Sequence, residues 1–258
     1  MADVEVIVVR AAGINCDLET VHAWRLAGAR ARLVHVNELI RQPGLLDRAR
    51  ALTIPGGFSY GDDIAAGRIL ALRFAHHLAR PVRAFIDAGK LVLGICNGFQ
   101  VLVTMGLLPA GRVGPNRVSL APNTSGRFED RWVRMKVCTQ RCAFLEGIDY
   151  LEAPVAHGEG RLVVDSKQTL AALRDAGHVA LRYVDESGQA GVYPANPNGS
   201  VDGLAGLVDD TGQVLGLMPH PERAVDATHH PLWTRRPGAH RANGLELFRT
   251  AVRTLAQS

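Results

Sequence analysis

The sequence predicts an α/β fold in a single domain, residues 1–258, with a mostly parallel sheet flanked by helices and additional antiparallel strands. Three observations predict it. The first half alternates strand-like and helix-like segments, the pattern of a parallel sheet with right-handed crossovers. Residues 91–95 form an apolar run typical of a strand buried on both faces. The second half carries short strand-like runs joined by turn sequences, which favours antiparallel pairing.

Composition is that of an ordinary globular protein. Of the 258 residues, 47% are hydrophobic and 21% are charged, which allows a sizeable core. No apolar run approaches the length of a membrane span, so we expect a cytoplasmic enzyme. The net charge is +4, but basic residues are scattered and are not interleaved with aromatic ones. We therefore expect neither a nucleic acid nor a membrane as a partner.

The first half should contain two helices besides the one that follows residue 96. The first of them, capped by Asn15 or Asp17, should run to about residue 29. The second should span about residues 67–88, and Pro81 should break or kink it because proline has no N–H. The expected strands are residues 4–9, 31–36, 51–54 and 91–95.

The second half should begin with an ordered loop at residues 109–129, which is rich in Pro, Gly and Asn. Asp209–Gly212 should turn a hairpin, and residues 243–255 should close the chain as an amphipathic helix. The expected strands of this half are residues 132–138, 154–156, 179–184, 204–208 and 214–218.

The clearest chemical motif is Gly94-Ile95-Cys96-Asn97-Gly98, which follows the apolar strand and precedes a helical pattern. A strand that turns into a helix around G-x-C-x-G is the cysteine form of a nucleophile elbow, in which glycines leave room for the sharp turn. The helix N-terminus favours a thiolate, and the Asn97 N–H should face an oxyanion. The alternative is a buried structural cysteine, but the flanking glycines favour a nucleophile.

The other cysteines, Cys16, Cys138 and Cys142, are irregularly spaced, and a chain of this size needs no disulfide framework. Cys138 and Cys142 have no matching Cys or His pair that would complete a zinc site. We expect structural thiols and no metal.

The third strand is followed by a glycine-rich stretch, residues 55–63. It is neither a Walker loop nor a dinucleotide fingerprint, since the required lysine and glycine spacings are missing. Either it is a plain tight turn, or the Gly57 N–H completes an oxyanion hole opposite Asn97.

A cysteine nucleophile needs a base, and the base needs a group that orients it. His157 and His220 are each followed two residues later by glutamate. Prolines on both sides of His220 stiffen its loop, and Glu222 at i+2 points to the same side of an extended segment. We therefore assign His220 as the base and expect His157 to lie in a more flexible loop facing a ligand or partner.

These motifs resemble those of the class I, triad-type glutamine amidotransferases, whose match here is Gly94–Gln100 together with Pro219–Glu222. Within that class the chain resembles the glutaminase subunits of phosphoribosylformylglycinamidine synthase. The narrower match rests on four phrases: Pro55-Gly-Gly-Phe-Ser-Tyr-Gly-Asp-Asp63, Asn123-Thr-Ser-Gly-Arg-Phe-Glu129, Ala156-His-Gly-Glu-Gly-Arg161 and Tyr193-Pro-Ala-Asn-Pro-Asn-Gly-Ser200.

The resemblance implies a flavodoxin-like fold and a triad of Cys96, His220 and Glu222. It implies hydrolysis of glutamine to glutamate and ammonia through a cysteinyl thioester. Gln100 lies one helical turn beyond the cysteine and either faces the substrate or lies on the helix surface. Weaker candidates for substrate binding are Asn123, Ser125 and Phe128.

The resemblance also implies partners. A synthetase subunit would receive the ammonia and convert formylglycinamide ribonucleotide to formylglycinamidine ribonucleotide in purine biosynthesis, and in many bacteria and archaea a small subunit bridges the two. ATP and Mg would be used by the synthetase, since this chain shows no ATP loop and we expect no cofactor in it.

Three alternatives remain. The chain could serve another synthetase, such as that for guanylate, carbamoyl phosphate or anthranilate, but the phrases at residues 123–129 and 156–161 argue against this. It could be a cysteine peptidase or chaperone of related fold, for which the Pro-His-Pro-Glu sequence is not expected. It could be a regulatory subunit with a vestigial triad, against which the intact Cys, His and Glu argue.

Overall fold

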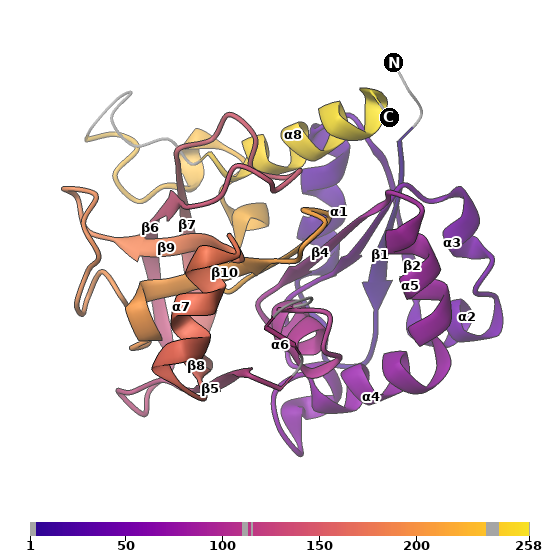
Figure 1. Ribbon diagram of the computed structural model, residues 1–258. Helices are drawn as coiled ribbons and strands as arrows, with labels where there is room; N and C mark the ends of the chain where they lie inside the picture. Colours follow the sequence, from indigo (N-terminus) through magenta and orange to yellow (C-terminus); the bar gives the residue numbers. More distant parts are fainter. Residues whose placement is uncertain (1–3, 110–112, 115, 236–242, 258) are drawn as a thin grey trace.

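The computed structural model describes residues 4–109, 113–114, 116–235 and 243–257. Within these residues the backbone forms one nine-stranded sheet in the order β2-β1-β3-β4-β11-β10-β9-β6-β7 (Figure 1). Five strands pair in parallel: β1 (Glu5–Arg10), β2 (Arg30–His35), β3 (Ala51–Ile54), β4 (Leu91–Ile95) and β11 (Val214–Leu217).

The sheet continues from β11 through antiparallel strands: β10 (Leu204–Val208), β9 (Val179–Val184), β6 (Glu129–Val137) and β7 (Tyr150–His157). A separate pair is formed by β5 (Val118–Pro122) and β8 (Glu159–Val164). The combination of a parallel half and an antiparallel half agrees with the architecture predicted from the sequence. Every residue of β4 is buried, as expected for a central strand.

Helices surround the sheet (Figure 1). α1 and α8 pack against each other, and the rings of Trp24 and Phe248 meet edge to face with centroids 5.2 Å apart. α6 packs against β4 on the side where α4 lies. The helices are α1 (Asp17–Leu26), α2 (Val36–Arg41), α3 (Leu45–Arg48), α4 (Arg68–His77), α5 (Ala79–Asp87), α6 (Asn97–Thr104), α7 (Lys167–Asp175) and α8 (Gly244–Gln257).

Two predictions about helices need correction. The long helix expected around Pro81 is broken into α4 and α5 at Leu78, three residues earlier. The proline ring would clash with the carbonyl four residues before it, so proline is placed in the first turn of a new helix. At the start of α1 the N-cap residue is Cys16, and Asp17 is the first helical residue, with its carboxylate paired with Arg10 and accepting from the Leu18 N–H.

The expected loop at residues 109–129 is also only partly a loop. Residues 110–112 and 115 lie outside the described residues, and β5 occupies 118–122. The segment of His157, expected to be flexible, is instead ordered strand: β7 ends at His157 and β8 begins at Glu159. The strand β8 and the helices α2, α3 and α7 were not predicted, and the segment between β2 and β3 was expected to be a loop.

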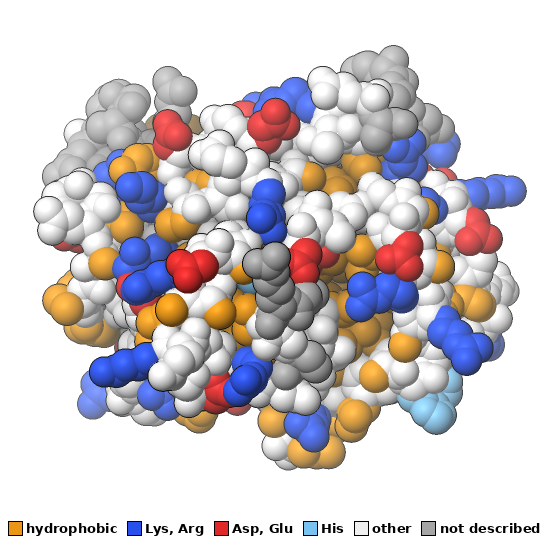
Figure 2. All heavy atoms as spheres, in the orientation of Figure 1, with side chains coloured by type: hydrophobic (Ala, Val, Ile, Leu, Met, Phe, Trp, Pro, Cys, Tyr) orange, Lys and Arg blue, Asp and Glu red, His pale blue; other side chains and the backbone are white. Residues whose placement is uncertain are grey.

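The parallel strands bring four loops to one edge of the sheet, because the carboxyl ends of β1, β3, β4 and β11 all lie there. These loops carry the motifs singled out in the sequence. On the face shown in Figure 2, basic and acidic side chains are interspersed. No helix within the described ranges is both long and apolar enough to cross a membrane.

Candidate active site

Cys96 lies at a sharp turn between β4 and α6. Its backbone has φ 51° and ψ −106°, a conformation that a residue with a side chain rarely adopts. A Cβ on Gly94 would lie 2.7 Å from the Gly98 carbonyl oxygen, and a Cβ on Gly98 would lie 1.8 Å from that of Ile54. The glycines are therefore required by close backbone packing, as the nucleophile elbow predicts.

The Cys96 side chain is almost enclosed, with 5% of its surface exposed. Its backbone N–H donates to the Leu217 carbonyl at 2.8 Å, which ties the elbow to β11. The sulfur lies 3.9 Å from the Ala156 carbonyl oxygen at the end of β7. The elbow thus sits where the parallel and antiparallel halves of the sheet meet.

His220 and Glu222 face each other as the sequence predicts. The imidazole Nδ1 and the carboxylate Oε1 are 2.6 Å apart, and both side chains are buried. Glu222 belongs to the short 3-10 helix η3 (Pro221–Arg223), which begins directly after His220. Because a carboxylate accepts, Nδ1 carries the proton, and Nε2 is the nitrogen available to a thiol.

Nε2 of His220 makes no hydrogen bond to the described residues. Burial of the ring lowers its pKa, but the charge of Glu222 and the interaction with Cys96 outweigh burial and raise the pKa well above the ordinary value. Both groups lie against the same stretch of β7: the His220 N–H donates to the Pro154 carbonyl at 2.8 Å, and the Cys96 sulfur lies 3.9 Å from the Ala156 carbonyl oxygen. The hydrogen bond between a nucleophile and its base often tightens only when substrate is bound.

Gly57 and Asn97, the predicted oxyanion-hole residues, follow the neighbouring strands β3 and β4. Asn97 is the first residue of α6, so its N–H has no acceptor within the helix. The neighbours of Gly57 make the backbone hydrogen bonds here: the Phe58 N–H donates to the Gly13 carbonyl, and the Gly56 carbonyl accepts from the Cys16 N–H. The Gly57 N–H takes part in neither bond. Gly57 has φ 143°, and a Cβ there would lie 2.7 Å from the Gly13 carbonyl oxygen.

The Asn97 side chain joins the two segments that follow these strands. Its Oδ1 accepts from the Ser59 N–H at 3.2 Å, and its Nδ2 donates to Asp62 at 3.1 Å and to Gln100 at 2.9 Å. Burial raises the pKa of the Asp62 carboxyl. The glycine-rich stretch of residues 55–63 is thus fixed against the elbow, which a plain tight turn would not require.

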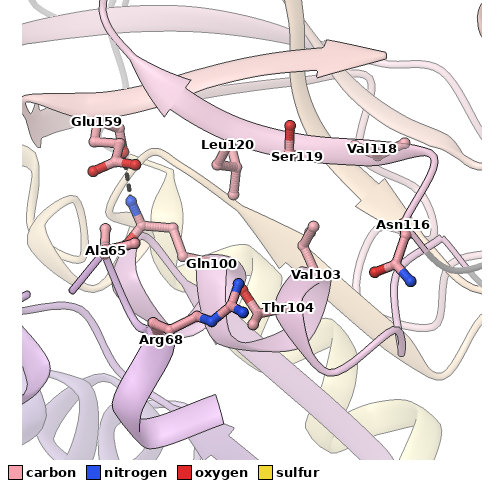
Figure 3. Close-up of a pocket in the computed structure, with 11 residues that line it drawn as sticks. Ala65, Arg68, Gln100, Val103, Thr104, Asn116, Val118, Ser119, Leu120 and Glu159 are labelled. Atoms are coloured by element: carbon pink, nitrogen blue, oxygen red, sulfur yellow. Dashed lines mark hydrogen bonds between the residues drawn. The ribbon is translucent and has the colours of Figure 1, made fainter. Parts of the chain in front are cut away.

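Gln100 is buried, and its Nε2 donates to the Glu159 carbonyl oxygen. It also lines a pocket of about 250 Å³, together with Arg68 of α4 and Glu159 of β8 (Figure 3). Burial and the nearby Asp62 raise the pKa of Glu159. The side chain therefore points to the pocket wall and away from the solvent-exposed helix surface.

Asn123, Ser125 and Phe128, the weaker substrate-binding candidates, lie in three different environments. Asn123 is buried and holds the end of β7, donating to the His157 carbonyl at 2.8 Å. Ser125 donates to Glu129 at 2.9 Å. Phe128 is 54% exposed, and its ring lies 6.5 Å from that of Phe58 between centroids.

His157 is buried beside the site. Its Nδ1 lies 3.1 Å from Asn123 Oδ1, and because the Asn123 amide already donates to two carbonyls, His157 Nδ1 is the donor. Its Nε2 faces Asn198 at 3.5 Å. Burial and the charge of His220 lower its pKa to about 4, so it stays neutral.

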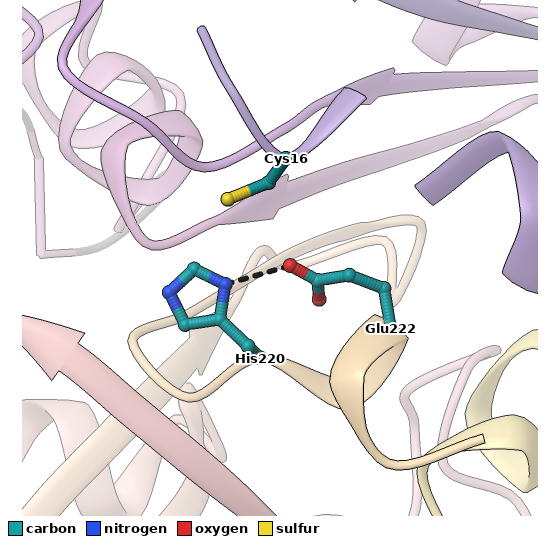
Figure 4. Close-up of side chains that lie close together, drawn as sticks. All are labelled: Cys16, His220 and Glu222. Carbon is teal, nitrogen blue, oxygen red and sulfur yellow. Dashed lines mark hydrogen bonds and ion pairs between the residues drawn. The ribbon is translucent and has the colours of Figure 1, made fainter. Parts of the chain in front are cut away.

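Cys16, expected from the sequence to be a structural thiol, lies near the site. Its sulfur, His220 and Glu222 have ligand-type atoms within 4.8 Å of one another (Figure 4). Cys138 is exposed and Cys142 is buried elsewhere. The signal that points to Cys16 is topological: it follows β1, whose carboxyl end lies at the same sheet edge as the elbow.

Comparisons with known proteins agree with this geometry. A family model described as a CobB/CobQ-like glutamine amidotransferase domain matches residues 3–254. The chain is 40% identical to phosphoribosylformylglycinamidine synthase subunit PurQ of Dehalococcoides mccartyi, with 100% of both chains covered. It is 39% identical to subunit PurQ of Methanococcus maripaludis, with 96% of each covered.

A solved structure extends the likeness to three dimensions. A chain of PurLQS from Thermotoga maritima matches with a TM-score of 0.71 at 31% identity, covering 97% of this chain and 98% of that one. The predicted fold of a class I glutamine amidotransferase is therefore confirmed. The chain belongs to the PurQ family of phosphoribosylformylglycinamidine synthase subunits.

Proposed function

We propose that this chain is the glutaminase subunit of phosphoribosylformylglycinamidine synthase and that it hydrolyses glutamine through a thioester on Cys96. The observation that carries the proposal is the buried His220–Glu222 pair, 2.6 Å apart, with Nε2 unpaired and the thiol of the strained elbow held against the same strand, β7. A thiol, an imidazole and a carboxylate in this order are the parts of a cysteine nucleophile, its base and the group that orients the base.

Each part has a defined task in the reaction. His220 Nε2 takes the proton from Cys96, and the thiolate attacks the side-chain amide carbon of glutamine. Glu222 holds the proton on Nδ1 and stabilises the imidazolium that forms. The high pKa of His220 favours that imidazolium at neutral pH.

The next steps release the products. The N–H groups of Gly57 and Asn97 donate to the oxygen of the tetrahedral intermediate, which develops negative charge. The intermediate collapses to the glutamyl thioester as His220 gives its proton to the leaving ammonia. Water, deprotonated by His220, then attacks the thioester carbon and releases glutamate and the Cys96 thiol.

The pocket beside Gln100 is the proposed site for the α-amino and α-carboxylate groups of glutamine. Arg68 and Glu159 on its wall carry the opposite charges that this zwitterion requires. One helical turn separates Gln100 from Cys96, a rise of about 6 Å that an extended glutamine can span. The charge pair and this separation support Gln100 as a substrate-binding residue.

The partner is proposed from the relatives. Their names describe a synthase subunit, and one matching chain comes from a structure titled PurLQS. We propose that a synthetase subunit, with a small bridging subunit, receives the ammonia and makes formylglycinamidine ribonucleotide. ATP and Mg would be bound there, and the complex would act in the cytoplasm, where ATP is available.

The test uses the assembled complex with either glutamine or ammonium as the nitrogen source. Cys96→Ala should abolish formation of the amidine product from glutamine and leave its formation from ammonium at the wild-type rate. Cys142→Ala, the same change at another buried cysteine, should affect neither. Glutamine use by the Cys96→Ala complex would overturn the proposed nucleophile.

A further inference from the structure

A second sulfur lies against the proposed catalytic imidazole. Cys16 is the N-cap residue of α1, and 1% of its surface is exposed. Its backbone is fixed on both sides: the Cys16 N–H donates to the Gly56 carbonyl at 3.2 Å, and its own carbonyl accepts from Thr20. In Figure 4 its Sγ points toward the His220 ring.

The space around Gly56 shows how closely the two groups pack. A Cβ placed on Gly56 would lie 2.7 Å from His220 Cε1, 3.3 Å from His220 Nδ1 and 3.1 Å from Cys16 Sγ. The Cys16 sulfur and the Nδ1–Cε1 edge of the His220 ring therefore both pack against the backbone of Gly56. The sulfur occupies space beside the ring, since Cys16, His220 and Glu222 have ligand-type atoms within 4.8 Å of one another.

Arg223 fixes the sulfur from the other side. Its guanidinium donates to Cys16 Sγ at 3.2 Å and forms an ion pair with Glu19 of α1 at 2.8 Å. Arg223 directly follows Glu222 in η3, so the contact links α1 to the same 3-10 helix that presents the carboxylate.

The three residues Cys16, His220 and Glu222 are the chemical types that bind zinc, but two features oppose a metal here. The Nδ1–Oε1 distance of 2.6 Å is that of a closed hydrogen bond. The metal would need the Cys16 sulfur as a ligand, but the positively charged guanidinium of Arg223 already contacts that sulfur and would repel a cation.

We propose that Cys16, held by Arg223, is a positioning residue of the glutaminase: its sulfur holds the Nδ1–Cε1 edge of His220 and keeps water from the bond to Glu222. The proposal rests on the proposed function. Titratable groups interact with the imidazole from four places: Glu222 of η3, Cys96 of the elbow, His157 of β7 and Cys16 before α1. Arg223 contacts the Cys16 sulfur.

Loss of the sulfur affects His220 in two ways. Water enters the vacated space and competes for Nδ1, which loosens the ring. The interaction with Cys16 also contributes to the raised pKa of His220, so its removal lowers that pKa. The alkaline limb of the rate profile, where the imidazolium loses its proton, then moves to lower pH.

The experiment compares Cys16→Ala and Cys16→Ser with wild type in the assembled complex. For Cys16→Ala, kcat for glutamine hydrolysis should fall about tenfold or more, with KM changed less than about twofold, because the sulfur positions the base without touching substrate. The alkaline limb should move to lower pH. Cys16→Ser, whose hydroxyl accepts from Arg223, should recover much of the rate. Cys142→Ala should match wild type in kcat and pH profile.

A folded Cys16→Ala complex with wild-type kcat and pH profile would overturn the proposal. If Cys16→Ala does not fold, Arg223→Met decides: the sulfur then loses the guanidinium that holds it, so kcat should fall with KM little changed, and wild-type kcat in a folded Arg223→Met complex would refute the proposal. Failure of the proposed function is distinguished by Cys96→Ala, which would then still use glutamine.

Discussion

Gly56→Ala tests how finely the proposed base must be placed. The backbone at Gly56 is outside the left-handed region, so alanine is allowed there, but its Cβ would lie 2.7 Å from His220 Cε1. Ordinary contacts begin at 3.4 Å, so the ring must retreat by about 0.7 Å. His220 is bonded to Glu222 and buried, so it cannot turn away without disturbing that bond.

A displacement of this size should lower kcat for glutamine hydrolysis about 30-fold, which corresponds to about 2 kcal/mol in the activation free energy. The assay is steady-state glutamine hydrolysis by the complex, with ammonium-dependent synthesis as an internal measure of intact assembly. KM for glutamine should change little, because the new methyl group contacts the base and the Cys16 sulfur.

Gly44→Ala is the matched control, since its Cβ would meet Asp47 at an ordinary 3.4 Å, far along the chain from the site. It should leave kcat unchanged. Gly56→Ala has two effects, a lower kcat from displacement of His220 and a lower stability from overpacking. Thermal unfolding measures the second, which should be about 1–3 kcal/mol. A Gly56→Ala complex with wild-type kcat would refute the placement of His220 beside Gly56.

Three further predictions concern the groups around the base. Glu222→Gln should lower kcat at least about 100-fold and move the alkaline limb to lower pH, since Glu222 is the main group raising the pKa of His220; an unchanged pH profile would count against the pair. His157 stays neutral with a pKa of about 4 against 6.5 when unfolded, so it contributes stability above pH 6.5 that is lost as the pH falls to about 4, up to about 3 kcal/mol. Urea unfolding of His157→Gln should show a smaller loss over that range than wild type, and equal losses would contradict this. Asn123→Ala leaves buried polar partners unpaired and should cost about 2 kcal/mol, or about 4–8 °C in Tm. Ser125→Ala, at an exposed position, should stay within about 0.5 kcal/mol, and equal effects of the two changes would refute this reading of Asn123.

The parallel half of the fold was predictable because its signals are local. Apolar runs give its strands, and the glycines at 94 and 98 predict the elbow through simple steric exclusion. The pairing of His220 with Glu222 was predictable too, because prolines at 219 and 221 limit the conformations of a four-residue segment. The His220–Glu222 contact joins residues that are close in sequence, and the glycines are recognised from the motif itself, although Gly98 packs against the distant Ile54.

The misses at His157 and at β5 come from contacts between distant segments. His157 is followed by Gly158-Glu159-Gly160, whose two glycines favour a loop. The pairing of β7 with β6 and the hydrogen bonds between His157 and Asn123 nevertheless order it. Strand β5 lies in a stretch rich in loop-forming residues and is specified by its pairing with β8. No local pattern contains these partners.

Cys16 illustrates the same limit for the site. Its neighbours in sequence are typical of a loop before a helix, and the chemistry that makes it interesting comes from Arg223 and His220, about two hundred residues away. Only the order of strands in the sheet brings them together. Strand topology predicted from the sequence therefore indicates which loops to search for such residues.

Rapid quenching of the complex with isotopically labelled glutamine, followed by peptide mass spectrometry, identifies the nucleophile directly. We expect a glutamyl thioester on Cys96 in wild type and none in His220→Ala. A label on Cys16 or another cysteine, or undiminished label on Cys96 in His220→Ala, would contradict this expectation.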